Sequence, residues 1–144
     1  MSIWFKPFTV NELNKRSQHT MADFLGIEFI SIGEDSLTAT MPVNERTRQP
    51  LGILHGGANV ALAETVASTA ANAAINLDRY YCVGLEINAN HIKSAKEGLV
   101  TAVTKPIHLG RSTQVWQIDI FDEEKQKTCV SRMTAAVVAR KNKA

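Results

Sequence analysis

The 144 residues of this chain include few cysteines, few aromatic residues and almost no excess charge of either sign. A net charge of +2 gives no indication of a nucleic-acid partner, and 44% hydrophobic with 21% charged residues is typical of a globular protein rather than a disordered one. No apolar run is long enough to cross a membrane, and the first residues lack the hydrophobic region of a signal peptide. We therefore expect a single domain over residues 1–144, in the cytoplasm, with no nucleic-acid or membrane partner.

The two cysteines, Cys82 and Cys129, are too few for a disulfide scaffold and lack CxxC spacing. Both lie in strand-like segments, so we expect reduced thiols in the core. A catalytic cysteine is the alternative, and no local signature supports it.

The motifs of several large enzyme classes are also missing. The sequence contains no GxSxG, GxxxxGK[ST], GxGxxG or HExxH pattern. The histidines show no metal-ligand spacing, which leaves a metal site built from His55, His91, His108 and Glu64 as an alternative without positive support.

One long helix is predicted from Gly57 to about Leu77, a segment with no proline and eight alanines. Its side chains are small and apolar on nearly every face, as expected for a helix surrounded by other structure. Its single acid is Glu64. Because burying an uncompensated carboxylate is costly, this acid needs a structural or functional partner.

The rest of the chain predicts strands, apart from a short leading helix at Thr9–Ser17 with a capping-box pattern. Alternating residues predict a hairpin from Phe24 to Val43 and four more strands at Tyr81–Ile92, Leu99–His108, Thr113–Phe121 and Thr128–Val138. Short polar connectors favour antiparallel neighbours. We therefore expect an α+β fold in which one antiparallel sheet of six strands is covered by the long helix, with sheet edges that pair with a second copy.

The start of the long helix is the candidate site. Backbone N–H groups at Gly56 and Gly57 lack helical partners, so they could bind an anion or a developing oxyanion. Glu64, Ser68 and Asn72 are four residues apart and form a polar stripe. The stripe could be a buried hydrogen-bond network without chemistry, or Glu64 could act as general base or nucleophile beside the Ser68 hydroxyl.

A structural interpretation remains open beside a functional one for His55, for His91 and for the basic group around Arg111. His55 could simply cap the helix start, and His91 could be a satisfied structural histidine. Arg111, with Lys93 and His108, could form a phosphate-binding patch or a solvated rim.

Three segments together resemble the hotdog-fold acyl-CoA thioesterases. They are Gln49…His55-Gly56-Gly57…Glu64…Ser68, then VGLEINANH at 83–91, then KPIHLGR at 105–111. The resemblance extends from about Trp4 to Val138. Within the family it is strongest to the branch that hydrolyses 1,4-dihydroxy-2-naphthoyl-CoA in menaquinone biosynthesis and to the proofreading thioesterases of enterobactin synthesis.

This resemblance implies a curved antiparallel sheet wrapped around a central helix, and it implies roles for individual residues. Glu64 would be the catalytic carboxylate, Gly56 would donate its N–H to the oxyanion, and Ser68 would orient water or the acid. Gln49 and His55 would position the thioester. The remaining implied substrate-binding residues are Val83, Gly84, Asn90 and His91, with His91 near the acyl group, and His108, Gly110, Arg111 and Ser112 near the nucleotide end of CoA.

The resemblance also implies hydrolysis of a thioester, of aromatic acyl-CoA type, without a metal or redox cofactor, coenzyme A being part of the substrate. Family members form dimers, often doubled to tetramers, with sites between subunits. The alternatives are a proofreading hydrolase acting on aryl carrier-protein thioesters, a non-catalytic acyl-thioester binding domain, and, with less support, a dehydratase-type hotdog enzyme.

Overall fold

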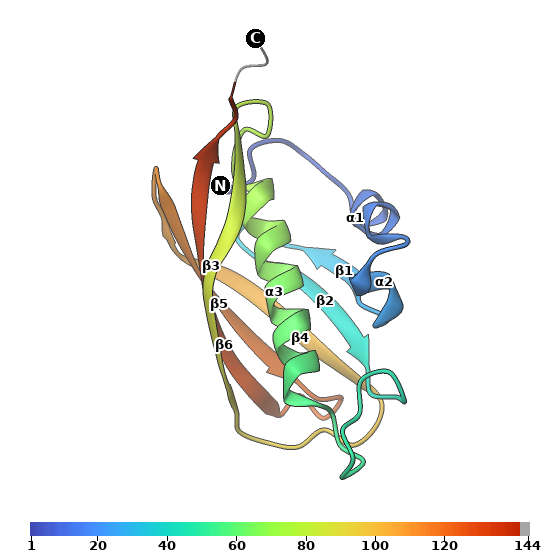
Figure 1. Ribbon diagram of the computed structural model, residues 1–144. Helices are drawn as coiled ribbons and strands as arrows, with labels where there is room; N and C mark the ends of the chain where they lie inside the picture. The colour runs from blue at the N-terminus through green and yellow to red at the C-terminus, as the bar shows by residue number, and fades with distance from the viewer. Residues whose placement is uncertain (142–144) are drawn as a thin grey trace.

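The computed structural model describes residues 1–141, which form three helices and six strands (Figure 1). In chain order the elements are α1 (Val10–Ser17), α2 (Met21–Phe24), β1 (Glu28–Ile32), β2 (Leu37–Pro42), α3 (Gly56–Ala73), β3 (Tyr80–His91), β4 (Leu99–Leu109), β5 (Thr113–Phe121) and β6 (Lys127–Ala139).

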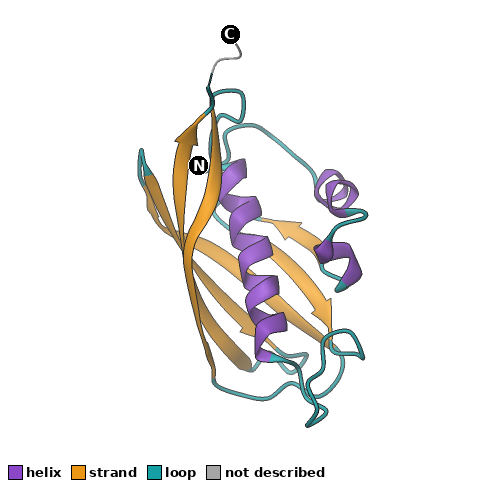
Figure 2. Cartoon of the chain, viewed as in Figure 1, coloured by secondary structure: helices purple, strands orange, loops and turns teal. Residues whose placement is uncertain are grey.

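The strands form one antiparallel sheet in the order β1-β2-β4-β5-β6-β3. The sheet curves around α3, while α1 and α2 lie beside the β1 end (Figure 2). This confirms the predicted α+β architecture, a hotdog fold of six strands around one long helix. Alternating burial along β5 confirms that one face of the sheet is packed.

The core lies between α3 and the concave face of the sheet. Leu62 and Val66 on α3 are fully buried, as are Trp116 and Ile118 on β5 and Met133 on β6. Four alanines of α3 are also fully buried, at positions 63, 67, 70 and 71. Because alanine side chains are short, the sheet can wrap closely around the helix.

Two element boundaries differ from the prediction by more than one residue, and both differences have a local cause. The long helix ends at Ala73 rather than near Leu77, because Asn76 forms a turn in which its carbonyl accepts from Tyr80 N (2.9 Å) and its side chain accepts from Asp78 N (3.0 Å). The first strand begins at Glu28 rather than Phe24, because α2 and a left-handed turn at Gly26 (φ +74°) precede it.

The predicted capping box at the start of α1 is confirmed. Thr9 Oγ1 accepts from Glu12 N (3.2 Å), and the Glu12 carboxylate accepts from Thr9 N (2.7 Å). The two groups satisfy each other's donors, so α1 begins at a fixed residue.

An asparagine side chain covers part of each sheet edge. On β1, the Asn14 side chain of α1 both donates to Phe29 O (2.9 Å) and accepts from Phe29 N (2.8 Å), as a neighbouring strand would. On β3, the Asn72 side chain does the same for Cys82, donating to its O (3.3 Å) and accepting from its N (2.8 Å). Beyond Cys82 the outer side of β3 has no strand beside it within residues 1–141, and Leu85 there is 61% exposed.

Candidate active site

The loop before α3 leaves one backbone donor free. His55 is the N-cap of the helix: its ring Nδ1 accepts from Gly57 N (2.8 Å), and its carbonyl accepts from Ala58 N (3.0 Å) and Asn59 N (3.2 Å). Gly56 N has no hydrogen-bond partner within residues 1–141. The cap suggested for His55 is therefore present, and the N–H of Gly56 remains available to a ligand oxygen at the positive end of the helix dipole.

Gly56 is needed here because a histidine packs against it. A Cβ on residue 56 would lie 2.9 Å from Nε2 of His91, so any larger residue would displace the ring. The other ring nitrogen, Nδ1, lies 3.3 Å from Nδ2 of Asn59, a side chain only 5% exposed. His91 is thus held between the first two turns of α3 and the end of β3.

Gln49 faces the same space. A cavity of about 370 Å³ brings together three of the predicted site residues, Gln49, Gly56 and His91. The Gln49 side-chain oxygen accepts from Leu51 N within its own turn (2.5 Å), which leaves the amide NH₂ as the group free to donate. We call this set the loop half-site.

Glu64 lies elsewhere, in an open hollow of about 490 Å³ between α3 and β3. Its carboxylate rests against the Cα of Gly84, where any Cβ would collide with Oε1. Ser68 Oγ donates to the same oxygen (3.2 Å). Glu64 is half-buried rather than enclosed, because it faces the open side of β3 while neighbouring residues of α3 face the sheet. We call Glu64, Ser68 and Gly84 the acid half-site.

The polar stripe predicted along α3 therefore divides into two parts. Glu64 and Ser68 contact each other and face open space. Asn72, one turn further on, uses its side chain to hold β3 at Cys82. The interpretation of the stripe as a structural network is correct for Asn72.

The two half-sites do not share a cavity within one chain. Gly56 and Glu64 are eight residues apart on one helix, about 12 Å along its axis. The cavity of the loop half-site and the hollow of the acid half-site have no lining residue in common.

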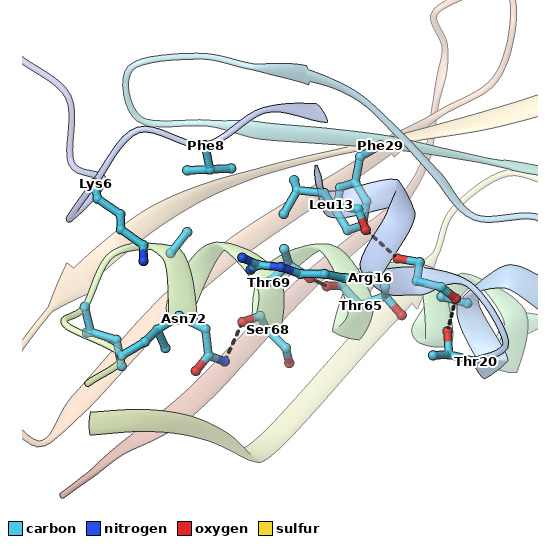
Figure 3. Close-up of a pocket in the computed structure, with 15 residues that line it drawn as sticks. Lys6, Phe8, Leu13, Arg16, Thr20, Phe29, Thr65, Ser68, Thr69 and Asn72 are labelled. Atoms are coloured by element: carbon cyan, nitrogen blue, oxygen red, sulfur yellow. Dashed lines mark hydrogen bonds between the residues drawn. The ribbon is translucent and has the colours of Figure 1, made fainter. Parts of the chain in front are cut away.

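A third cavity, which the sequence did not predict, lies between α1 and α3 (Figure 3). Its volume is about 370 Å³, and Ser68 lines it. Its other walls come from the N-terminal segment, α1, β1 and the residues after α3, and they include Phe8, Leu13 and Phe29. We call it the α1–α3 cavity. No motif marks it, because its lining residues are scattered from Lys6 to Leu77.

The predicted CoA-contacting residues of the last segment lie at the end of β4 (His108) and in the turn between β4 and β5, seen in orange at the upper left of Figure 1. Arg111, Ser112 and His108 are exposed, and Gly110 N donates to Thr113 O (2.9 Å). None of these four residues lines the cavities described above. On β3, Val83 and Asn90 are exposed but line none of them either.

The cysteines are not part of either half-site. Both are buried and free. Burial raises the pKa of the Cys82 thiol to about 11, and burial together with Asp119 raises the pKa of the Cys129 thiol to about 11. Both are therefore neutral thiols near pH 7, which confirms the prediction of reduced core cysteines and argues against a catalytic one.

Residues 1–141 contain neither a metal-binding cluster nor a helix that could span a membrane. No three His, Cys, Asp or Glu side chains converge in a way that could hold a metal ion. No helix in that range has the length and apolar character needed to cross a membrane.

Comparison with known proteins assigns the chain to one family. Residues 51–129 match the thioesterase superfamily. The chain is 51% identical over 136 residues to the 1,4-dihydroxy-2-naphthoyl-CoA hydrolase of Escherichia coli K12, covering 94% of this chain and 99% of that protein. It is 46% identical over 136 residues to the proofreading thioesterase EntH of Cronobacter turicensis, covering 94% and 98%.

Solved structures agree with the sequence relatives. A mutant thioesterase from Pseudomonas aeruginosa matches with a TM-score of 0.95 at 45% identity, covering 96% of this chain and 100% of that one. A thioesterase from Haemophilus influenzae matches with a TM-score of 0.93 at 49% identity, covering 95% of each chain. The chain therefore belongs to the thioesterase superfamily and is a thioester hydrolase with the hotdog fold.

Proposed function

We propose that this enzyme hydrolyses an aromatic acyl-CoA thioester at a site shared by two copies of the chain. The observation that carries the proposal is the separation of the two half-sites: the carboxylate and the free helix N–H lie in different cavities of one chain, although thioester hydrolysis needs both on one carbonyl group. A second copy can supply the missing half.

The open edge of β3 supports this pairing. An antiparallel contact between β3 and the same strand of a second copy is isologous, so the two strands run in opposite directions about a two-fold axis. The half of β3 that carries Gly84 then lies alongside the half of the partner strand that ends at His91. Glu64 rests on Gly84 and Gly56 packs on His91, so this contact brings each acid half-site toward a loop half-site of the partner subunit. A dimer, or a tetramer made of two such dimers, follows.

In the proposed mechanism the thioester carbonyl oxygen accepts a hydrogen bond from the N–H of Gly56 of the partner subunit. The donor is fixed before the reaction and sits at the helix N-terminus, so it stabilises the negative charge that develops on this oxygen, an effect usually of about 10²–10³ in rate. The Gln49 amide NH₂ and the exposed His55 ring are placed to position the thioester from the same loop.

Glu64 supplies the other half of the chemistry. It takes a proton from water as the water oxygen bonds to the carbonyl carbon, or its carboxylate attacks that carbon directly and water then hydrolyses the acyl-enzyme. Either route breaks the C–S bond, passes a proton to the departing CoA thiolate, and yields a free acid and CoA. Ser68 orients the carboxylate through its hydrogen bond to Oε1.

An aromatic acyl group is supported by the α1–α3 cavity, which opens beside Ser68 and has Phe8, Leu13 and Phe29 in its walls. The 1,4-dihydroxy-2-naphthoyl-CoA hydrolase relative points to the same substrate class. For the nucleotide end of CoA we propose the β4–β5 turn with Arg111, whose exposed guanidinium suits a phosphate. No further cofactor enters the proposal, and a cytoplasmic location suits an acyl-CoA substrate.

A substrate panel tests the proposal. Wild-type enzyme and Glu64→Gln are compared on 1,4-dihydroxy-2-naphthoyl-CoA, benzoyl-CoA, a fatty acyl-CoA and an aryl carrier-protein thioester, with release of free thiol as the readout. We expect the aromatic CoA thioesters to be hydrolysed fastest and the variant to lose about 10²–10⁴ in turnover, the usual value of a positioned acid or base. Full activity of the folded variant would refute the role of Glu64, and a preference for the carrier-protein thioester would favour a proofreading function.

A further inference from the structure

We propose that the α1–α3 cavity selects acyl groups that carry a carboxylate at the end remote from the thioester, and that Arg16 and Lys6 bind this carboxylate. The inference rests on the proposed function, since it places the acyl group of that substrate in this cavity.

The charge of the cavity wall is of one sign. Among its fifteen lining residues are two cations, Lys6 and Arg16, and no acid. Neither cation forms a salt bridge within residues 1–141. The acid one turn before Arg16 on α1 is Glu12, and its carboxylate is already bound to Thr9 N (2.7 Å) and Thr9 Oγ1 (3.0 Å) in the capping box. Hydrogen bonds to Thr9 lower the pKa of Glu12 most, and the charges of Arg16 and Lys6 also contribute to lowering it. No acid within residues 1–141 forms an ion pair with either cation, so both can still bind a ligand.

The cations lie over the cavity rather than away from it. Figure 3 shows the Arg16 side chain crossing the opening above Thr69, with its guanidinium turned toward the side on which Lys6 lies. Both residues are exposed. A planar guanidinium can bind a carboxylate with two parallel hydrogen bonds, and a lysine adds a point charge.

The distances along α3 fit an aromatic ring. The reacting end of the acyl group is fixed near Ser68, which lines the cavity and donates to Glu64. Asn72, which lines the cavity near the Lys6 end in Figure 3, is four residues further, about 6 Å along the axis. One ring with a substituent opposite its thioester spans such a distance, and Phe8, Leu13 and Phe29 provide apolar walls for the ring. The ring is thus held by apolar contacts and its far end meets the cations.

The test uses two substrates that differ only in this charge, benzoyl-CoA and 4-carboxybenzoyl-CoA. Wild-type enzyme is compared with Arg16→Gln, with the double variant Arg16→Gln and Lys6→Gln, and with Arg16→Lys. Lys15→Gln is the matched control, because Lys15 is an exposed cation of the same helix that does not line the cavity. Circular dichroism verifies that each variant is folded.

We expect the double variant to lose about 10- to 100-fold in kcat/KM for 4-carboxybenzoyl-CoA, the range of one or two charge-assisted hydrogen bonds, and less than about twofold for benzoyl-CoA. Arg16→Lys should retain more of the preference than Arg16→Gln, and Lys15→Gln should change neither substrate. Equal losses for both substrates, or none, would overturn the inference while leaving the proposed function in place.

A binding measurement separates the two proposals. If wild-type enzyme hydrolyses neither substrate, the proposed function fails, and calorimetric titration with 4-carboxybenzoate and benzoate then decides the inference alone. Tighter binding of the dianion that is lost in the double variant supports it. Equal affinity of wild-type enzyme for the two acids overturns it.

Discussion

If each active site combines two chains, two inactive variants should restore activity in each other. Glu64→Gln removes the carboxylate and keeps a side chain of the same shape against Gly84 and within reach of Ser68. Gln49→Ala removes a donor from the loop half-site and leaves the acid half-site unchanged. In a mixed dimer, one site receives the intact loop of the first variant and the intact carboxylate of the second, while the other site carries both changes.

The expected recovery follows from counting sites. After random exchange of equal amounts, half of the sites take their acid from the Gln49→Ala chain, and half of those take their loop from the Glu64→Gln chain. About one quarter of wild-type activity per chain should therefore return, and the fraction is the same for a dimer and for a tetramer of dimers. Each parent should retain about 1% or less, since a lost acid or base and a lost positioned donor each cost about 10²-fold or more.

Free-thiol release from benzoyl-CoA measures the recovery. The variants are mixed in denaturant and refolded together, and the same mixture made after separate refolding serves as the control. Activity equal to the average of the two parents would show that the acid and the loop act within one chain, and would refute the β3-edge pairing proposed above.

Two further predictions concern Gly84 and the two buried cysteines. Gly84→Ala should fold but lose about 10²-fold in kcat, because its Cβ pushes the Glu64 carboxylate away from Ser68 and a displacement of about 1 Å is enough for such a loss; an unchanged kcat would show that this contact does not set the position of the acid. Cys82 and Cys129 have raised pKa values of about 11 in the folded protein, so their contribution to stability is present below the unfolded value near 9 and is lost as pH rises toward 11. Urea denaturation at pH 8 and pH 10.5 should show a larger loss for wild-type protein than for the variant with alanine at both positions.

Much of the fold could be predicted because its signals are local. The alternation along β5 and the capping box of α1 are each contained in a few adjacent residues, and both are confirmed. The end of α3 was not predictable from alanine content, because the turn that ends the helix depends on the Asn76 side chain and on hydrogen bonds to residues that follow it.

The features of the site also divide into those that sequence spacing suggests and those that depend on tertiary packing. The cap at His55 and the contact between Glu64 and Ser68 join residues no more than four apart, and spacing alone suggested both. The α1–α3 cavity could not be predicted, since Arg16 and Phe29 meet α3 only through tertiary packing. The distance between Gly56 and Glu64 follows from helix geometry, but no local pattern predicts the second copy that we propose to bring the two half-sites together.

The packing of α3 against β3 fixes the positions of the two half-sites within one chain. Each contact pairs a glycine with a functional side chain: Gly56 of the helix lies against His91 of the strand, and Gly84 of the strand lies against Glu64 of the helix. Neither glycine has a left-handed backbone, so both positions require glycine for close approach and not for conformation. Because helix and strand run in opposite directions, one contact lies at the helix N-terminus and the end of the strand, and the other lies near the middle of both elements. In the dimer that we propose, a two-fold axis across the β3 edge would bring the Gly56 contact of one chain toward the Glu64 contact of the other, so the proposed acid and oxyanion donor, separated within one chain, would become neighbours between two.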